Sequence, residues 1–133
     1  MKNRPNILFF FPDQHRHDWI EMTPGLPART PNLKTLAAQG TRFTNAICPS
    51  PLCAPARAIL ATGKEYERCE VPSNGRNLPD NALTFYRLLS QSGYHVMGCG
   101  KFDLRKAALS WGHDGQQLVN GKSYVTEWGF SDG

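Results

Sequence analysis

The sequence predicts an α/β domain in which helices flank a mostly parallel sheet. Short apolar runs alternate along the chain with segments of helical periodicity, and Pro or Gly separates the two kinds of segment. The 133 residues are 40% hydrophobic and 20% charged, a composition typical of one globular domain with a core of its own.

Three apolar runs are the predicted strands. Residues 6–11 form a continuous run that ends at Pro12, and such a run is typical of a strand covered on both faces, as in a parallel sheet. Residues 42–47 and 94–99 are the second and third predicted strands.

The first predicted helix follows Thr30. Thr30 is its expected N-cap, Pro31 lies in its first turn and Gly40 ends it. The side chains expected to face the core are Leu33, Leu36 and Ala37. Two more helices are predicted, over residues 55–62 and 83–92, and a glycine follows each of them.

Reactive and charged side chains lie just beyond the carboxyl ends of the predicted strands. In a sheet of this kind, binding and catalytic residues lie at those ends. Asp13 and Gln14 follow the first strand, and Lys101 follows the third. Cys53 directly precedes the second helix. Arg57 comes four residues later, so it lies on the same side of that helix as Cys53. The first N–H groups of the helix point to the same place and favour an anion there. We therefore expect these side chains to converge on one edge of the sheet.

The run that contains Cys53, Pro55 and Arg57 and ends in Thr62-Gly63-Lys64 resembles the sulfatase signature. The opening residues 4–8 with Asp13, and the later residues 93–103, are similar to the start and the second signature of the same family. The resemblance covers nearly all of the chain. It implies that residues 1–133 are the N-terminal portion of an alkaline-phosphatase-like sulfatase catalytic domain, whose remaining metal and sulfate ligands come from later sequence.

The resemblance also implies roles for individual residues. Cys53 is the residue converted after translation to formylglycine, whose hydrate attacks sulfur and releases the alcohol, and later expels the sulfate as the aldehyde re-forms. Arg57 orients the hydrate and offsets its charge, and Lys101 binds the sulfate. Asp13, Gln14 and the modified Cys53 bind a divalent metal, usually calcium.

Three residues leave alternatives open. Gln14 contacts the metal or a substrate oxygen, or only orients Asp13. His15 either contacts the substrate or belongs to a polar surface loop. Asp103 stands where the family has a histidine, and it either pairs with Lys101 or Arg105 or faces the substrate.

The predicted function is metal-dependent hydrolysis of a small-molecule or carbohydrate sulfate ester. Phosphonate monoester or phosphodiester hydrolysis is the alternative within the same superfamily. A non-catalytic fragment that binds an anion or a partner is the alternative from another class. The expected protein partner is the remainder of the catalytic domain or a second copy of the chain.

The formal charge of +4 is spread along the sequence and predicts no nucleic-acid partner. No apolar run approaches the roughly 20 residues of a membrane span, so no membrane association is predicted. The chain as written is expected in the cytoplasm, or in the periplasm or outside the cell if a signal peptide precedes it. Free buried thiols are expected at Cys48, Cys69 and Cys99, with a disulfide as the alternative in an exported protein.

Overall fold

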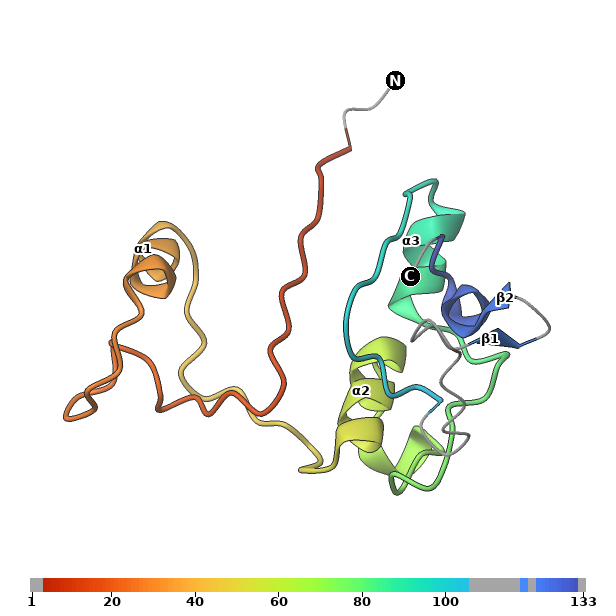
Figure 1. Cartoon of the computed structure of the whole chain (residues 1–133), viewed down its shortest axis with the longest axis horizontal. Helices are drawn as coiled ribbons and strands as arrows, with labels where there is room; N and C mark the ends of the chain where they lie inside the picture. The colour runs from red at the N-terminus through yellow and green to blue at the C-terminus, as the bar shows by residue number, and fades with distance from the viewer. Residues whose placement is uncertain (1–3, 106–117, 120–121, 132–133) are drawn as a thin grey trace. The chain divides into compact units, whose positions relative to one another are not determined.

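The computed structural model describes residues 4–105, 118–119 and 122–131 (Figure 1). The chain divides into two compact units, Met1–Ala46 and Ile47–Gly133. The first unit contains the helix α1, and the second contains all the other helices and strands described.

Helix α1, Pro31–Gln39, has the bounds that the sequence predicts, with Pro at its start and Gly40 after its end. Thr30 precedes the helix, but its side chain does not cap it. Its hydroxyl instead accepts a hydrogen bond from Glu21 N at 2.9 Å, and Glu21 reaches Thr30 N at 3.3 Å and Lys34 Nζ at 3.3 Å. These hydrogen bonds and the ion pair with Lys34 therefore hold the start of α1 in place around Glu21.

The predicted buried stripe of α1 is wrong, because none of the helix's residues is buried. Leu33 and Leu36 are exposed and Ala37 is partly exposed. An amphipathic face is buried only where another element packs against it, and the packing around α1 leaves this stripe largely exposed.

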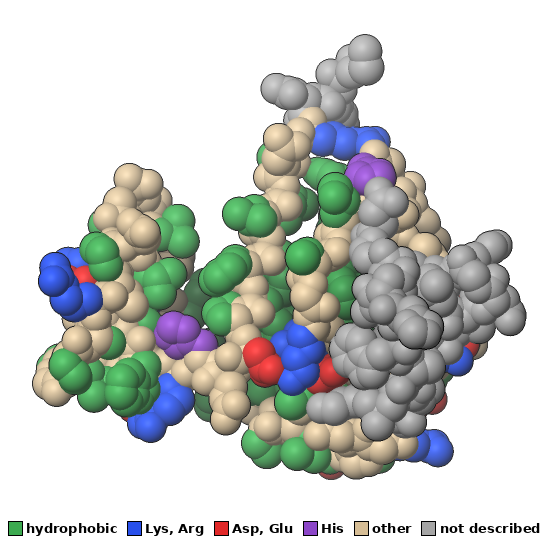
Figure 2. Space-filling model, in the orientation of Figure 1, with side chains coloured by type: hydrophobic (Ala, Val, Ile, Leu, Met, Phe, Trp, Pro, Cys, Tyr) green, Lys and Arg blue, Asp and Glu red, His purple; other side chains and the backbone are tan. Residues whose placement is uncertain are grey.

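The predicted mostly parallel sheet is absent from the described residues. Their only strands are β1, Leu118–Val119, and β2, Lys122–Ser123, which pair antiparallel with Leu118 opposite Ser123. Residues 6–11 and 42–47 form no strand, and residues 94–99 contain only an isolated bridge at Met97. A strand forms by pairing with a neighbour, and the apolar side chains of the first run lie at the surface instead (Figure 2). Leu8 is 93% and Phe10 79% exposed.

The second unit is built on helices α2, Cys53–Thr62, and α3, Phe85–Gln91, with short 3₁₀ turns at Tyr66–Arg68 and Tyr124–Trp128. Helix α2 begins at Cys53, two residues before its predicted start, and ends at Gly63 in the left-handed conformation. Gly63 N donates to Ile59 O at 2.8 Å, a C-cap that favours glycine. Helix α3 is shorter than predicted because Thr84 caps it, its hydroxyl accepting from Arg87 N at 3.1 Å.

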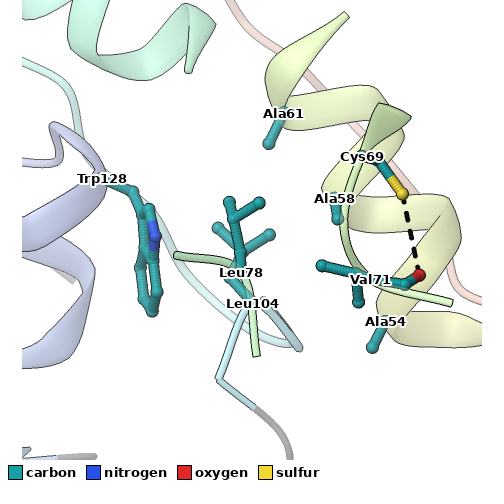
Figure 3. Packing of buried hydrophobic residues seen from close by; sticks show 8 residues of the cluster. All are labelled: Ala54, Ala58, Ala61, Cys69, Val71, Leu78, Leu104 and Trp128. Carbon is teal, nitrogen blue, oxygen red and sulfur yellow. Dashed lines mark hydrogen bonds between the residues drawn. The ribbon is translucent and has the colours of Figure 1, made fainter. Parts of the chain in front are cut away.

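The core of the second unit lies along one face of α2. Ala54, Ala58 and Ala61 recur at helical spacing and are fully buried. Figure 3 shows these alanines turned toward Val71 and Leu78. The whole cluster consists of Ala54, Ala58, Ala61, Cys69, Val71, Leu78, Leu104 and Trp128. The small alanines let the following loops pack close to the helix, and this packing fixes the helix that carries Cys53.

Candidate active site

Cys53 is the first residue of α2, and Arg57 lies one turn further along the helix. Ala54 and Ala58 anchor the adjacent face in the core, and Arg57 is itself buried, while Cys53 is half-buried. Pro55 suits the first turn, because its missing N–H would have no partner within the helix. The helix therefore holds the sulfur at its N-terminus, partly open to solvent.

Lys101 meets Cys53 although the two residues are distant in sequence. Its Nζ donates a hydrogen bond to Cys53 Sγ at 3.3 Å and lies 3.3 Å from Asp103 Oδ2. Asp103 therefore pairs with Lys101, one of its predicted partners, and Arg105 pairs with Asp80 at 3.1 Å. One ammonium thus lies between a sulfur atom and a carboxylate.

Arg57 joins the same cluster through the backbone. Its Nη1 donates to the carbonyl oxygen of Lys101 at 2.5 Å. The structure therefore brings together the predicted catalytic residues Cys53, Arg57 and Lys101. Arg57 also acts on the core, because its positive charge opposes the rise in the pKa of Tyr86 that burial causes.

Asn74 is a residue of this site that the sequence did not predict. Leu52, at the N-cap of α2, has no side-chain hydrogen bond to offer. Asn74 Oδ1 instead accepts from Ala54 N at 3.0 Å and so caps the helix from a loop. Ser73 shapes that loop, because its hydroxyl accepts from Gly75 N at 3.2 Å. Turn-forming composition marks residues 73–75 as a loop, but no local pattern shows which helix the loop caps.

The predicted metal and substrate residues Asp13, Gln14 and His15 belong to the first unit and are exposed. Gln14 adopts the left-handed conformation with φ 54°, and His15 Nε2 bonds to Trp19 O at 3.3 Å. Their predicted convergence with Cys53 stays a prediction.

Within the residues described, no group of three or more His, Cys, Asp or Glu side chains forms a metal site. Calcium takes 6–8 oxygen ligands, so Asp13 and Gln14 do not by themselves make up its site. Nearby, Arg16 holds the pKa of Asp18 below its ordinary value through a two-pronged hydrogen bond at 2.9 and 2.5 Å.

All four cysteines are free thiols. Cys69 is buried as predicted, whereas Cys48 and Cys99 are exposed, so the prediction of burial is wrong for these two. Both lie in segments predicted as strands or next to them, and the described residues form no sheet there that would bury them. Over the described parts of the chain, no helix has the length and hydropathy to cross a membrane.

The sulfatase family model matches residues 5–126. "Uncharacterized sulfatase YidJ" of Escherichia coli is 37% identical over 101 residues, which are 76% of this chain and 20% of that protein. N-acetylglucosamine-6-O-sulfatase of Bacteroides thetaiotaomicron is 32% identical, covering 83% of this chain and 20% of its own length. Choline-sulfatase of Rhizobium meliloti is 36% identical over 74% of this chain and 19% of its own length.

The chain belongs to the sulfatase family, and it spans about a fifth of the length of these relatives. The family implies the α/β class that the sequence predicts, although the described residues form no parallel sheet. No solved structure matches the chain.

Proposed function

We propose that the chain carries the nucleophile of a sulfuric ester hydrolase and that Cys53 is converted to formylglycine. The observation that supports this most directly is the cluster of Cys53, Lys101 and Arg57 at the start of α2 in a chain of the sulfatase family. A position between a helix N-terminus and an ammonium group suits an anionic sulfate ester.

Each side chain of the cluster has a task in this proposal. When hydrated, formylglycine would supply two hydroxyl groups on one carbon. One would attack sulfur and displace the alcohol of the ester, and deprotonation of the other would expel the sulfate as the aldehyde re-forms. Lys101 places a positive charge at the reacting atom and stabilises the negative charge that develops on the sulfuryl oxygens. Arg57 fixes the backbone of Lys101 and adds a second positive charge close by.

The test of this function is co-expression with a maturation enzyme that converts cysteine to formylglycine, followed by intact-mass measurement and peptide mapping. We expect the aldehyde at residue 53 and unmodified thiols at Cys48, Cys69 and Cys99. Cys53→Ala is the control and should gain no aldehyde. An aldehyde at another cysteine, or none at Cys53 in an active protein that contains this chain, would contradict the proposal.

Phosphonate monoester or phosphodiester hydrolysis is the second candidate. Asp103 favours it, because this carboxylate stands where the sulfatase signature has a histidine, so the groups near Lys101 depart from the sulfatase pattern. The matured protein should be offered p-nitrophenyl sulfate and p-nitrophenyl phenylphosphonate side by side. Faster hydrolysis of the phosphonate would replace the sulfatase assignment. Hydrolysis of neither, with no aldehyde formed, would favour a non-catalytic binding role.

We also propose that Asp13, with Gln14, contributes ligands to a calcium ion, which needs further oxygen ligands besides these two. The chain should therefore bind calcium weakly, with a Kd above about 10⁻⁴ M. In titration calorimetry, Asp13→Ala should abolish this binding. Asp18→Ala, which alters a neighbouring carboxylate engaged with Arg16, should preserve it. Tight binding that persists in Asp13→Ala would disprove the assignment.

The proposed substrate is a small-molecule or carbohydrate sulfate ester. Two of the similar proteins are named for different sulfate esters, choline sulfate and N-acetylglucosamine 6-O-sulfate. Their similarity to this chain therefore supports the class of sulfate esters and not one particular ester.

A further inference from the structure

We propose that Asp103 is a positioning residue that holds the ammonium group of Lys101 against residue 53. The inference rests on the proposed function only in giving Lys101 a role toward sulfate. Its geometric basis is one Nζ atom that lies 3.3 Å from Cys53 Sγ and 3.3 Å from Asp103 Oδ2.

The surroundings of Asp103 are those of a carboxylate held in an ion pair with Lys101, not those of a charge on the solvated surface. Its side chain is only 13% exposed, so its ion pair with Lys101 is partly shielded from water. The carboxylate is therefore placed to direct Lys101.

The backbone also keeps this segment in shape. Asp103 lies in the left-handed region with φ 50°, which Asp and Asn tolerate better than most residues. Gly100 precedes Lys101 with φ 105°. Arg57 binds the Lys101 carbonyl at 2.5 Å, so Lys101 is held at its backbone by Arg57 and at its ammonium by Asp103. Because the Lys101 side chain is restrained at both ends beforehand, it loses less rotamer entropy when its ammonium group contacts the substrate.

This arrangement gives a kinetic signature for the loss of Asp103. Without the carboxylate, Lys101 keeps its charge and still attracts an anion, so KM should not rise. The ammonium is no longer directed at residue 53, so kcat should fall, by roughly 10–100-fold if displacement is of the order of an ångström. A residue that mattered only for folding would instead lower the amount of active protein, and it would leave unchanged both KM and the kcat calculated per active site.

The variant that tests this is Asp103→Asn, which keeps the shape and the left-handed backbone and removes the charge. The matched control is Asp80→Asn, which removes the ion pair with Arg105 on the same segment without touching Lys101. Both are measured in a matured, active protein that contains this chain. We expect the kcat loss without a KM rise only for Asp103→Asn. Equal effects of the two variants, or a normal kcat in Asp103→Asn, would overturn the inference.

A second readout needs no activity. In the unmatured chain, the acetylation rate of Lys101 by an amine-reactive ester is followed by peptide mass spectrometry. Lys34 and Lys64, which pair with Glu21 and Glu70, serve as internal references. We expect Asp103→Asn to speed acetylation of Lys101 severalfold, because the released ammonium is more accessible, and Asp80→Asn to leave it unchanged. Asp103→Gly, which also accepts φ 50°, takes the place of Asp103→Asn if circular dichroism shows that variant to be unfolded.

The two readouts separate this inference from the proposed function. A change in Lys101 acetylation in a protein that hydrolyses no sulfate ester supports the positioning role and contradicts the sulfatase activity. Unchanged acetylation in a protein that does hydrolyse sulfate esters contradicts the positioning role alone.

Discussion

Lys101 is the residue at which the contacts of the site meet. Its carbonyl accepts from Arg57, and its ammonium contacts both Cys53 and Asp103. Mutation of Lys101 therefore tests the site most directly.

In an active protein that contains this chain, Lys101→Ala should lower kcat/KM for a sulfate ester by about 10²–10³, the effect of losing a group that stabilises transition-state charge. Lys64→Ala is the matched control, because Lys64 lies just beyond the other end of α2 and pairs with Glu70 at 3.7 Å. Steady-state kinetics of both variants decide the matter. Near-normal kinetics for Lys101→Ala would show that this lysine is structural.

At this scale the sequence offered candidate residues but not all of their contacts. Cys53 and Arg57 are candidates because their spacing on one helix is local, and Lys101 because it follows an apolar run and lies in a family motif. The structure places these three together, while their catalytic roles stay predictions. Asn74 was missed because its bond to Ala54 joins a loop to a helix, and no short-range periodicity encodes such a contact.

Among the elements, α2 depends on a cap from outside the helix. Asn74→Ala removes the acceptor for Ala54 N and should lower the free energy of unfolding by about 1 kcal/mol. Asn74→Asp keeps an acceptor and adds a negative charge that a helix N-terminus favours, so it should preserve stability. Urea unfolding followed by circular dichroism measures both. An Asn74→Ala variant as stable as the wild type would show that the cap contributes nothing.

The start of α3 depends on a close approach by Gly129. A Cβ at this position would lie 2.3 Å from Arg87 Cα and 2.4 Å from Arg87 N, and φ is 103°. Gly129→Ala should therefore cost about 3 kcal/mol of stability, from overpacking against backbone and from strain. Gly63→Ala, at φ 65° with no atom within 4 Å of the added Cβ, should cost only about 1 kcal/mol of strain. Equal losses in denaturant unfolding would contradict the role of this contact.

Helices and strands differed in how well the sequence predicted them. The bounds of α1 follow from Pro31 and Gly40, and the end of α2 follows from Gly63, because caps are chosen by neighbouring residues. The parallel sheet did not form in the described residues, because strand pairing joins distant segments and an apolar run alone does not determine its partner. The same dependence on tertiary packing left the apolar stripe of α1 uncovered.

For the whole molecule, the main consequence is an apolar surface on the first unit. Every side chain of residues 7–11 is exposed (Figure 2). A continuous exposed apolar run favours association. The chain also spans only about a fifth of its relatives' length. We therefore expect this run to be covered by the remainder of a catalytic domain or by a second copy of the chain.

The purified chain should accordingly self-associate as its concentration rises, and sedimentation velocity should report a growing average mass. Leu8 and Phe10 are the most exposed residues of the run and lie two apart, on one face of an extended backbone. The double variant Leu8→Lys with Phe10→Lys should shift the chain toward monomer, because charges oppose edge-to-edge pairing. Leu88→Lys alters an exposed apolar residue of α3 outside the run and should associate like the wild type. If the wild-type chain stays monomeric throughout, or if Leu88→Lys disperses it equally well, residues 7–11 are not the surface that drives association.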